Sequence, residues 1–425
     1  MGTAGADRTR FMPNPSASLQ GASLIVRVVL VPLGITFVLQ MMVSVLQMTI
    51  PVLAPVLTAE AGLAPERIGN FTSLSFIGAL WFLTINAQVM PITGPLRLLQ
   101  IGNLIAATGL LLVLPGTWWA LLVAALLLGI GYGPTPPAGS QILATNTPAR
   151  MRSLVFSIKQ AGVPLGGAIA GLGAPWLAVH YGWRTAIVVI AGTVILSVVA
   201  VQPWRQRFDV NRQTALGFRP SLLLRPSILR EPVRAMRLSP ALLPLTYAGA
   251  SFAVVQGSVF SFLVTYLVDD VGLALATAGM AFAALQIVGV AARVGAGWFA
   301  DRIGSARRTL ILLSVFSAAM AVLLSTIDRS WPIEAIVLVC GTAGLAVASW
   351  NGVYLSEVAR VAPPDAVGDA TAGSTFFVFI GYVIGPSTFA ALVQVTGSYS
   401  PAFWTIGALV LTAGGVLWRL EARRT

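Results

Sequence analysis

The sequence predicts an all-α polytopic membrane protein with twelve transmembrane helices in two pseudo-symmetric six-helix bundles. Three observations predict this fold: the composition, the spacing of apolar runs, and an internal repeat. Of the 425 residues, 56% are hydrophobic and 9% are charged, whereas soluble globular proteins carry roughly 25% charged residues. At about 20 apolar residues per crossing, this composition suffices for roughly twelve helices.

Twelve apolar runs, bounded by charged residues, glycine or proline, follow one another along the chain. They are expected at 28–57, 68–90, 98–115, 118–145, 153–179 and 184–203, and then at 241–267, 276–300, 309–326, 334–359, 370–396 and 402–418. The fourth run holds three glycines and three prolines between Gly129 and Pro137, so we expect its helix to break. Irregular backbone at membrane depth can line a cavity, which makes Tyr132 a candidate substrate ligand.

The basic residues predict the orientation of the chain, because lysine and arginine are retained in the cytoplasm. Of 26 basic residues, 21 lie in the tails, the central linker and alternate loops, and three lie in loops on the other face. Both termini are therefore expected to be cytoplasmic, in the inner (plasma) membrane of a cell. The expected organisation is a tail (1–23), a six-helix bundle (24–203), a basic linker (204–239), a second bundle (240–420) and a short tail (421–425).

The two halves of the sequence repeat, which favours a duplicated six-helix unit. Polar and glycine positions recur in the second half at the same mutual spacing: Gln47 with Glu60 as Gln256 with Asp269, and Gly94 with Arg97 as Gly304 with Arg307.

A motif ends the eighth predicted helix, running from Gly297 to Arg308 as Gly-Trp-Phe-Ala-Asp-Arg-Ile-Gly-Ser-Ala-Arg-Arg. It resembles the loop signature of the major facilitator superfamily, Gly-x-x-x-Asp-Arg-x-Gly-x-x-Arg. The resemblance implies alternating-access transport and a gate in this loop, built from Asp301, Arg302, Gly304, Arg307, Arg308 and Glu357. It implies that Asp301 faces the N-terminal end of the fifth helix, where a helix dipole favours an anion. In the first-half copy Pro91 replaces the acid.

Several classes of function are excluded by residue counts. With one cysteine, Cys340, and one histidine, His180, the chain can form neither an internal disulfide nor the usual zinc or serine-triad sites. We therefore expect no enzyme, no metal and no cofactor. The net charge of +12 sits between apolar runs and indicates topology, not nucleic-acid binding. The expected partners are a small-molecule substrate, protons and the lipid bilayer, with the chain acting as a monomer.

Two basic residues lie inside predicted spans, whereas the acidic residues fall at helix ends. Arg293 and Lys159 are expected roughly 12 Å and 9 Å from the cytoplasmic ends of the eighth and fifth helices. A charge at this depth is costly unless it is paired or wet, so an anion between the two cations would stabilise both. The spacing of Arg293, Gly297 and Asp301 is similar to that in oxalate and monocarboxylate carriers, where this arginine contacts the carboxylate. Alternatively, Lys159 snorkels to the surface and Arg293 clamps helix carbonyls.

The predicted function is secondary active transport of a small organic anion, a carboxylate, by alternating access. Further polar or aromatic residues are candidate cavity ligands, or else interhelical hydrogen-bonding and packing residues: Gln47, Gln256, Trp350, Asn351 and Tyr354. Lys159 is also the candidate proton carrier, because lysine can lose its proton whereas arginine stays charged. The alternatives are a proton-coupled exporter of hydrophobic drugs or metabolites, and a transport-inactive receptor or sensor on the same fold.

The predicted orientation can be tested by labelling. A cysteine introduced at Ser221, in the linker, should react only from the cytoplasmic face, and one at Ser398, between the last two helices, only from outside. Labelling of Ser221 by an impermeant reagent in intact cells would show that the orientation is wrong.

Overall fold

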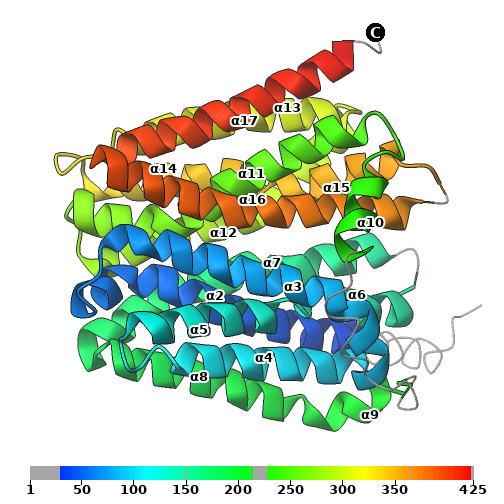
Figure 1. Ribbon diagram of the computed structural model, residues 1–425, viewed down its shortest axis with the longest axis horizontal. Helices are drawn as coiled ribbons and strands as arrows, with labels where there is room; N and C mark the ends of the chain where they lie inside the picture. Colours follow the sequence, from blue (N-terminus) through cyan, green and yellow to red (C-terminus); the bar gives the residue numbers. More distant parts are fainter. Residues whose placement is uncertain (1–28, 149–150, 211, 214–226, 365, 423–425) are drawn as a thin grey trace, which may run out of the picture.

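The computed structural model describes residues 29–148, 151–210, 212–213, 227–364 and 366–422. Long helices run side by side along one axis, with those of the first half of the chain on one side of the molecule and those of the second half on the other (Figure 1). Within the described residues, eleven helices are long and apolar enough to cross a membrane. The shorter apolar helix Pro95–Leu111, third along the chain, completes the predicted set of twelve.

The six spans of each half are confirmed as helices. The first half contains α2 (Val31–Glu60), α3 (Ile68–Thr93), α4 (Pro95–Leu111), α5 (Trp118–Tyr132) with α6 (Thr135–Asn146), α7 (Arg152–Tyr181) and α8 (Trp183–Ala200). The second contains α11 (Leu242–Thr265) with the turn η6 (Tyr266–Asp270), α12 (Leu275–Arg302), α13 (Ala306–Leu324), α14 (Ile333–Val347) with α15 (Trp350–Val361), α16 (Val367–Thr396) and α17 (Tyr399–Ala422).

The fourth span of each half is broken, between α5 and α6 and again between α14 and α15. The first break has a clear cause: Pro136 and Pro137 lack the N–H groups that would bond the carbonyls of Tyr132 and Gly133. The second break, at Ala348 and Ser349, was not predicted, because the segment carries no proline.

The same helix pair packs closely in each half through glycine. A Cβ atom at Gly129 of α5 would collide with the Ser75 carbonyl of α3, and one at Gly344 of α14 with the Leu285 carbonyl of α12. Backbones approach this closely only where a small residue stands at the contact. The repeat seen in the sequence is therefore a repeat of packing.

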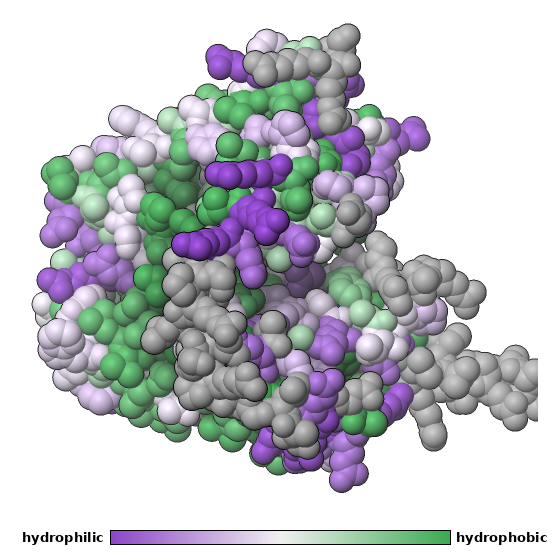
Figure 2. Space-filling model, turned by 45° about the vertical axis from the view of Figure 1, so that its right-hand side comes forward, coloured by the Kyte–Doolittle hydropathy of each residue, from purple (hydrophilic) through white to green (hydrophobic). Residues whose placement is uncertain are grey.

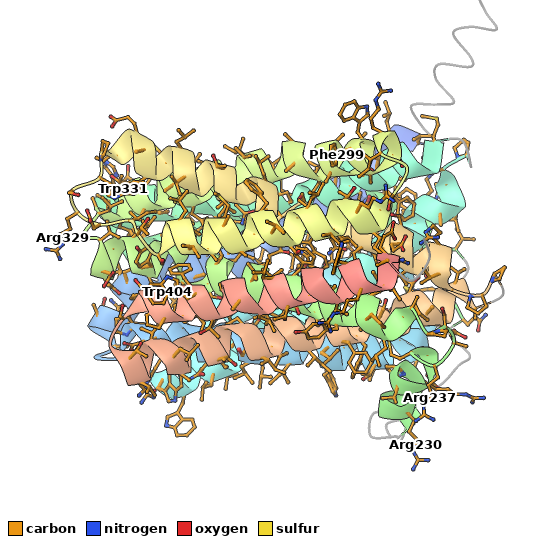
Figure 3. All side chains as sticks on the ribbon, turned by 90° about the horizontal axis from the view of Figure 1, so that it is seen from above. Arg230, Arg237, Phe299, Arg329, Trp331 and Trp404 are labelled. Atoms are coloured by element: carbon orange, nitrogen blue, oxygen red, sulfur yellow. The ribbon has the colours of Figure 1, made fainter. Side chains whose placement is uncertain are left out.

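The linker between the halves contains η4 (Gln202–Trp204), α9 (Arg205–Phe208) and α10 (Ser227–Ala235). These helices lie at the end of the bundle where α17 also ends (Figure 1), which we term the linker end. The opposite, far end carries Arg329 and Trp331 (Figure 3). Ser221 lies outside the described residues.

Asp209, just after α9, caps the N-terminus of α4. Its carboxylate accepts hydrogen bonds from the backbone N–H groups of Leu96, at 2.8 Å, and Arg97, at 3.1 Å. Gly94, the residue before α4, has φ +84° and no side chain with which to cap the helix, and a Cβ there would lie 2.5 Å from Asp209. Burial raises the pKa of Asp209, and the two N–H donors and nearby Arg205 oppose the rise.

A second contact holds the same part of the linker. The backbone N–H of Gln213 donates to the carbonyl of Pro91, in the last turn of α3, at 2.7 Å. In the other half the equivalent helix α13 needs no such help, because Ser305 caps it by accepting from the Arg308 N–H at 3.2 Å. In the first half, Asp209 of the linker therefore takes the capping role that Ser305 has within the motif of the second half.

We expect Asp209→Ala to lower the free energy of unfolding by about 1–2 kcal/mol, the usual effect of losing a helix N-cap. Asp209→Asn keeps one carbonyl acceptor and should lose roughly half as much. Thermal or denaturant unfolding of the purified protein in detergent measures both, and equal stability of Asp209→Ala and the parent would contradict the capping role.

Candidate functional site

The two halves meet through the pairs α7 with α12 and α3 with α16, and their closest approaches lie toward the far end. A Cβ at Gly171 would lie 2.9 Å from the Gly279 carbonyl, and Gly69 abuts the Pro386 carbonyl. Toward the linker end, a Cβ at Gly297 would meet no described atom within 4 Å. The halves are therefore closed against each other at the far end.

Arg293 of α12 bonds across this interface. Its Nε donates to the carbonyl of Ala348 at 2.9 Å, within the break between α14 and α15. Its Nη1 donates to the carbonyl of Gln160 in α7, in the other half, at 3.1 Å. Tyr132 and Tyr382 lie within electrostatic range of the guanidinium. A permanent cation thus stands where three helices and both halves meet.

In the first half, the helix equivalent to α12 is α3, and it also packs against the break of the fourth span. Phe82 of α3 packs against Gly133 at the α5–α6 break, just as Arg293 of α12 bonds Ala348 at the α14–α15 break. The repeat that pairs Gly94 with Gly304 pairs Arg293 with Leu83, the neighbour of Phe82. The helix α3 therefore presents no cation to its break, whereas α12 does.

Lys159 of α7 is also buried, with 1% of its surface exposed. Its Nζ donates to the Thr135 carbonyl at the start of α6, at 3.3 Å. Gly139 makes room for it, since a Cβ there would lie 2.7 Å from the lysine Cε. Lys159 therefore does not snorkel to the surface in this structure, and it bonds the α5–α6 break.

Three glutamines form hydrogen bonds around these cations. Gln40 of α2 donates to the side-chain carbonyl of Gln160 at 2.9 Å. Gln256 of α11 accepts from Trp350 Nε1 at 3.0 Å and from the Tyr382 hydroxyl at 2.8 Å. These bonds make Gln256 a link between α11, α15 and α16.

The other predicted ligands divide into two groups. Gln47 donates to the Ser75 hydroxyl at 2.8 Å, a bond within the first half, and Tyr354 is buried with its ring against Gly249. Tyr132 and Asn351 are half-buried. Gln47 and Tyr354 thus act as packing and hydrogen-bonding residues here.

Sequence reasoning missed an aromatic wall between the halves. Phe76 of α3 stacks on Tyr382 of α16 at a centroid distance of 4.7 Å and 13° between planes, and Phe379 meets Phe76 edge-on at 6.1 Å. The sequence does contain a signal for Tyr382, because its hydroxyl is a polar group within an apolar run and so marks a candidate site residue. Gln160 was also missed, although it follows Lys159 in the span.

The predicted gate residues separate into a buried network and an exposed turn. Arg307, with 1% exposed surface, donates to Glu357 at 2.9 Å and to Glu421 at 3.0 Å. Arg360 donates twice to Glu357, at 2.7 and 2.6 Å, and Arg308 donates to Glu421 at 3.1 Å. The sequence reading overlooked Glu421, an acid in the last turn of α17.

The exposed turn holds the rest of the motif. Asp301 and Arg302 are exposed, and no ion pair joins either of them to another described residue. Gly304 takes the positive φ of +66° that lets the chain turn into α13. The ion pairs of this motif thus all lie within the second half.

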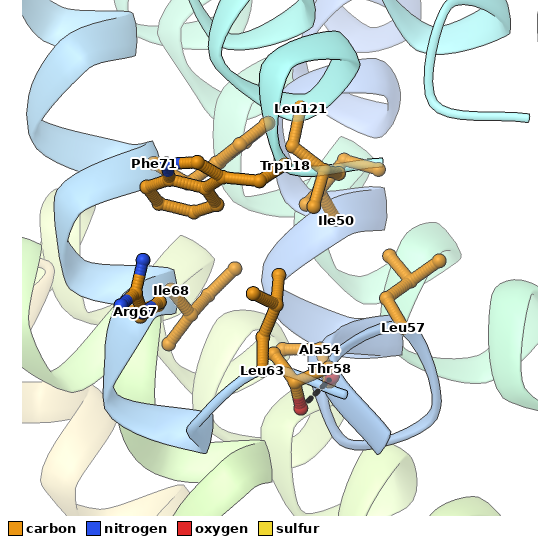
Figure 4. A pocket seen from close by; sticks show the side chains of 10 residues that line it. All are labelled: Ile50, Ala54, Leu57, Thr58, Leu63, Arg67, Ile68, Phe71, Trp118 and Leu121. Carbon is orange, nitrogen blue, oxygen red and sulfur yellow. Dashed lines mark hydrogen bonds between the residues drawn. The ribbon is translucent and has the colours of Figure 1, made fainter. Parts of the chain in front are cut away.

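One small pocket lies away from this site, at the far end of α2, α3 and α5 (Figure 4). It encloses about 20 Å³ between apolar side chains such as Ile50 and Phe71. The guanidinium of Arg67 lies 5.0 Å from the centre of the Trp118 ring beside it. Its size suits a single water molecule at most, so we do not assign it to a substrate.

Two bundles of six apolar helices, closed against each other at the far end and holding two buried cations nearer the linker end, are typical of a multi-pass membrane protein. The Major Facilitator Superfamily model matches residues 33–386, and the chain belongs to this family.

Individual relatives are distant. An MFS-type transporter of Mycobacterium tuberculosis is 26% identical over 290 residues, which are 67% of this chain and 61% of that protein. The 4-hydroxybenzoate transporter of Pseudomonas putida is 24% identical over 404 residues, covering 87% of this chain and 82% of the relative. A POT family transporter solved in complex with 5-aminolevulinic acid shares the fold, with a TM-score of 0.75, 12% identity, and coverage of 92% and 96% of the two chains.

We expect Glu357→Ala to lower the free energy of unfolding by about 3–5 kcal/mol, because it leaves the buried Arg307 without its main counter-charge. Glu421→Ala is the matched control: the carboxylate is 23% exposed, so its loss should cost about 1 kcal/mol or less. Unfolding in detergent measures both, and a smaller loss for Glu357→Ala than for Glu421→Ala would contradict this account.

Proposed function

We propose that this transporter moves a small organic anion by alternating access and that Arg293 binds its carboxylate. The observation that carries the proposal is the position of Arg293, which bonds both halves of the molecule through carbonyls alone. No carboxylate pairs with it among the described residues. A guanidinium has five N–H donors, and the two bonds leave others for a planar, two-oxygen ligand.

The comparisons support an organic acid as the substrate class. The 4-hydroxybenzoate transporter matches over most of both chains, and 4-hydroxybenzoate combines a carboxylate with an aromatic ring. The wall of Phe76, Phe379 and Tyr382 beside Arg293 offers apolar faces for such a ring. The same wall favours the second candidate, a proton-coupled exporter of hydrophobic compounds.

Lys159 is proposed as the second anionic contact or the proton carrier. Among the described residues, its ammonium group bonds the Thr135 carbonyl alone, and a neutral amine can keep a hydrogen bond to a carbonyl. Loss and gain of the proton therefore need not disturb the α5–α6 break. Uptake of a proton with the anion would give symport.

The inner gate is proposed at the linker end, which the distribution of basic residues predicts to be cytoplasmic. Closure at the far end corresponds to an inward-facing arrangement, in which Asp301 is exposed and unpaired among the described residues. In the outward-facing state Asp301 would meet the N-terminus of α7. The Arg307–Glu357 pair would hold the turn in place for that contact.

A thermal-shift screen of the purified protein tests the substrate class. Aromatic and aliphatic mono- and dicarboxylates should raise the melting temperature, and inorganic anions and lipophilic cations should not. Stabilisation by lipophilic cations alone would overturn the anion proposal and favour the exporter.

Arg293→Lys should lower carboxylate uptake about tenfold or more, because lysine keeps the charge but cannot present two parallel donors. Loss of one charge-assisted hydrogen bond costs about 1.5–3 kcal/mol, in line with that factor. The exposed far-end Arg329→Lys is the matched control and should transport normally. Normal uptake by Arg293→Lys would contradict the substrate-binding role and leave Arg293 a structural residue that bonds the α14–α15 break.

Lys159→Arg should bind and exchange the anion but lose its acceleration by an inward proton gradient, since arginine does not release its proton. Lys159→Gln, which is permanently neutral, should likewise be insensitive to the gradient. Uptake into proteoliposomes with and without a pH gradient measures this. A gradient that still drives uptake by both variants would refute the coupling role.

A further inference from the structure

The helix α10 of the linker differs in direction from the spanning helices. It runs across the bundle axis at the linker end, beside the ends of α15 and α16 (Figure 1). A short helix in this orientation lies parallel to the membrane plane, at the level where the spanning helices leave the lipid.

One side of this segment is fixed to the second bundle. Ala235 and Met236 are buried. Gly373 of α16 accommodates them, because a Cβ there would lie 2.6 Å from the Ala235 Cβ and 3.1 Å from the Pro232 carbonyl. The Thr246 hydroxyl of α11 donates to the Met236 sulfur at 3.1 Å. These contacts lie in the first two turns of α11 and α16, so they set α10 at the boundary of the membrane.

The other side carries a row of arginines. Arg230 and Arg234 lie four residues apart on one face of α10, Arg237 follows in the turn after the helix ends at Ala235, and all three are exposed. Arg230 points sideways away from the bundle, and Arg237 points out at the linker end (Figure 3). No ion pair or hydrogen bond joins their side chains to the described part of the chain, and Glu231 is the single acid of α10.

Apolar side chains accompany the arginines. Val233 is 47% exposed and Leu238 is 37% exposed. In the space-filling view, hydrophilic side chains gather at this end next to apolar surface (Figure 2). Exposed apolar groups interleaved with unpaired arginines match the boundary between acyl chains and headgroups.

We propose that the arginine row of α10 binds the headgroups of anionic phospholipids in the leaflet at the linker end. Each headgroup supplies the phosphate oxygens that a guanidinium bonds in pairs, and Val233 and Leu238 enter the region of the first acyl carbons. The two anchors on α11 and α16 hold the row in place, so the lipid meets preordered cations. The site is separate from Arg293 and does not depend on the transported substrate.

Native mass spectrometry of the protein in an uncharged detergent tests this site. Phosphatidylglycerol and phosphatidylcholine with the same acyl chains are titrated against the parent and R230Q/R234Q/R237Q. We expect the parent to prefer phosphatidylglycerol and the triple variant to bind it at least about tenfold more weakly, because each arginine near an anionic surface adds to the attraction. Phosphatidylcholine binding should not change.

Two controls separate this site from a general effect of charge. R67Q/R184Q/R329Q removes the same charge at the far end and should keep the preference, and Glu231→Gln should keep or strengthen it. Equal phosphatidylglycerol binding by the parent and R230Q/R234Q/R237Q would overturn the proposal, as would an equal loss in the far-end variant. Complete displacement of the lipid by inorganic phosphate at about 10 mM, where salt screening is still weak, would identify a site for free phosphate instead.

Discussion

The architecture depends on a constraint of the membrane interior: every backbone carbonyl without a helical partner must find another donor. Each bundle breaks its fourth span, and each break is bonded by a cation from a neighbouring helix. Lys159 bonds the Thr135 carbonyl in the first half, and Arg293 bonds the Ala348 carbonyl in the second. These carbonyls thus satisfy part of the hydrogen-bonding capacity of two buried cations, which offsets part of the cost of burying them.

This arrangement joins the two interpretations of Arg293 that the sequence left open. A clamp on helix carbonyls and a ligand for an anion are compatible when the guanidinium has spare donors. An anion on the spare donors would lie beside the bond that Arg293 makes to the Gln160 carbonyl of the other half. Under the proposed function, one side chain therefore contacts both the substrate and the facing bundle.

The sequence predicted the features that rest on composition and local chemistry. Apolar run length located the spans, and Pro136 with Pro137 located the first helix break. It did not predict the break at Ala348, where no residue type forces the backbone to change, or the partners of residues far apart in sequence. Gln160 with Arg293, Asp209 with Leu96, and Glu421 with Arg307 are such pairs, since their meeting depends on tertiary packing. The aromatic wall escaped notice because a single phenylalanine in a span is indistinguishable from a lipid-facing one.

The attachment of Gln213 to Pro91 sets the length of the tether between the bundles. From Gln213, held on the first bundle, to Ser227, where α10 begins, a fully stretched chain reaches at most about 50 Å. This reach is the upper limit that the covalent connection sets on the separation of its two attachment points, Gln213 and Ser227, in any movement of one bundle relative to the other.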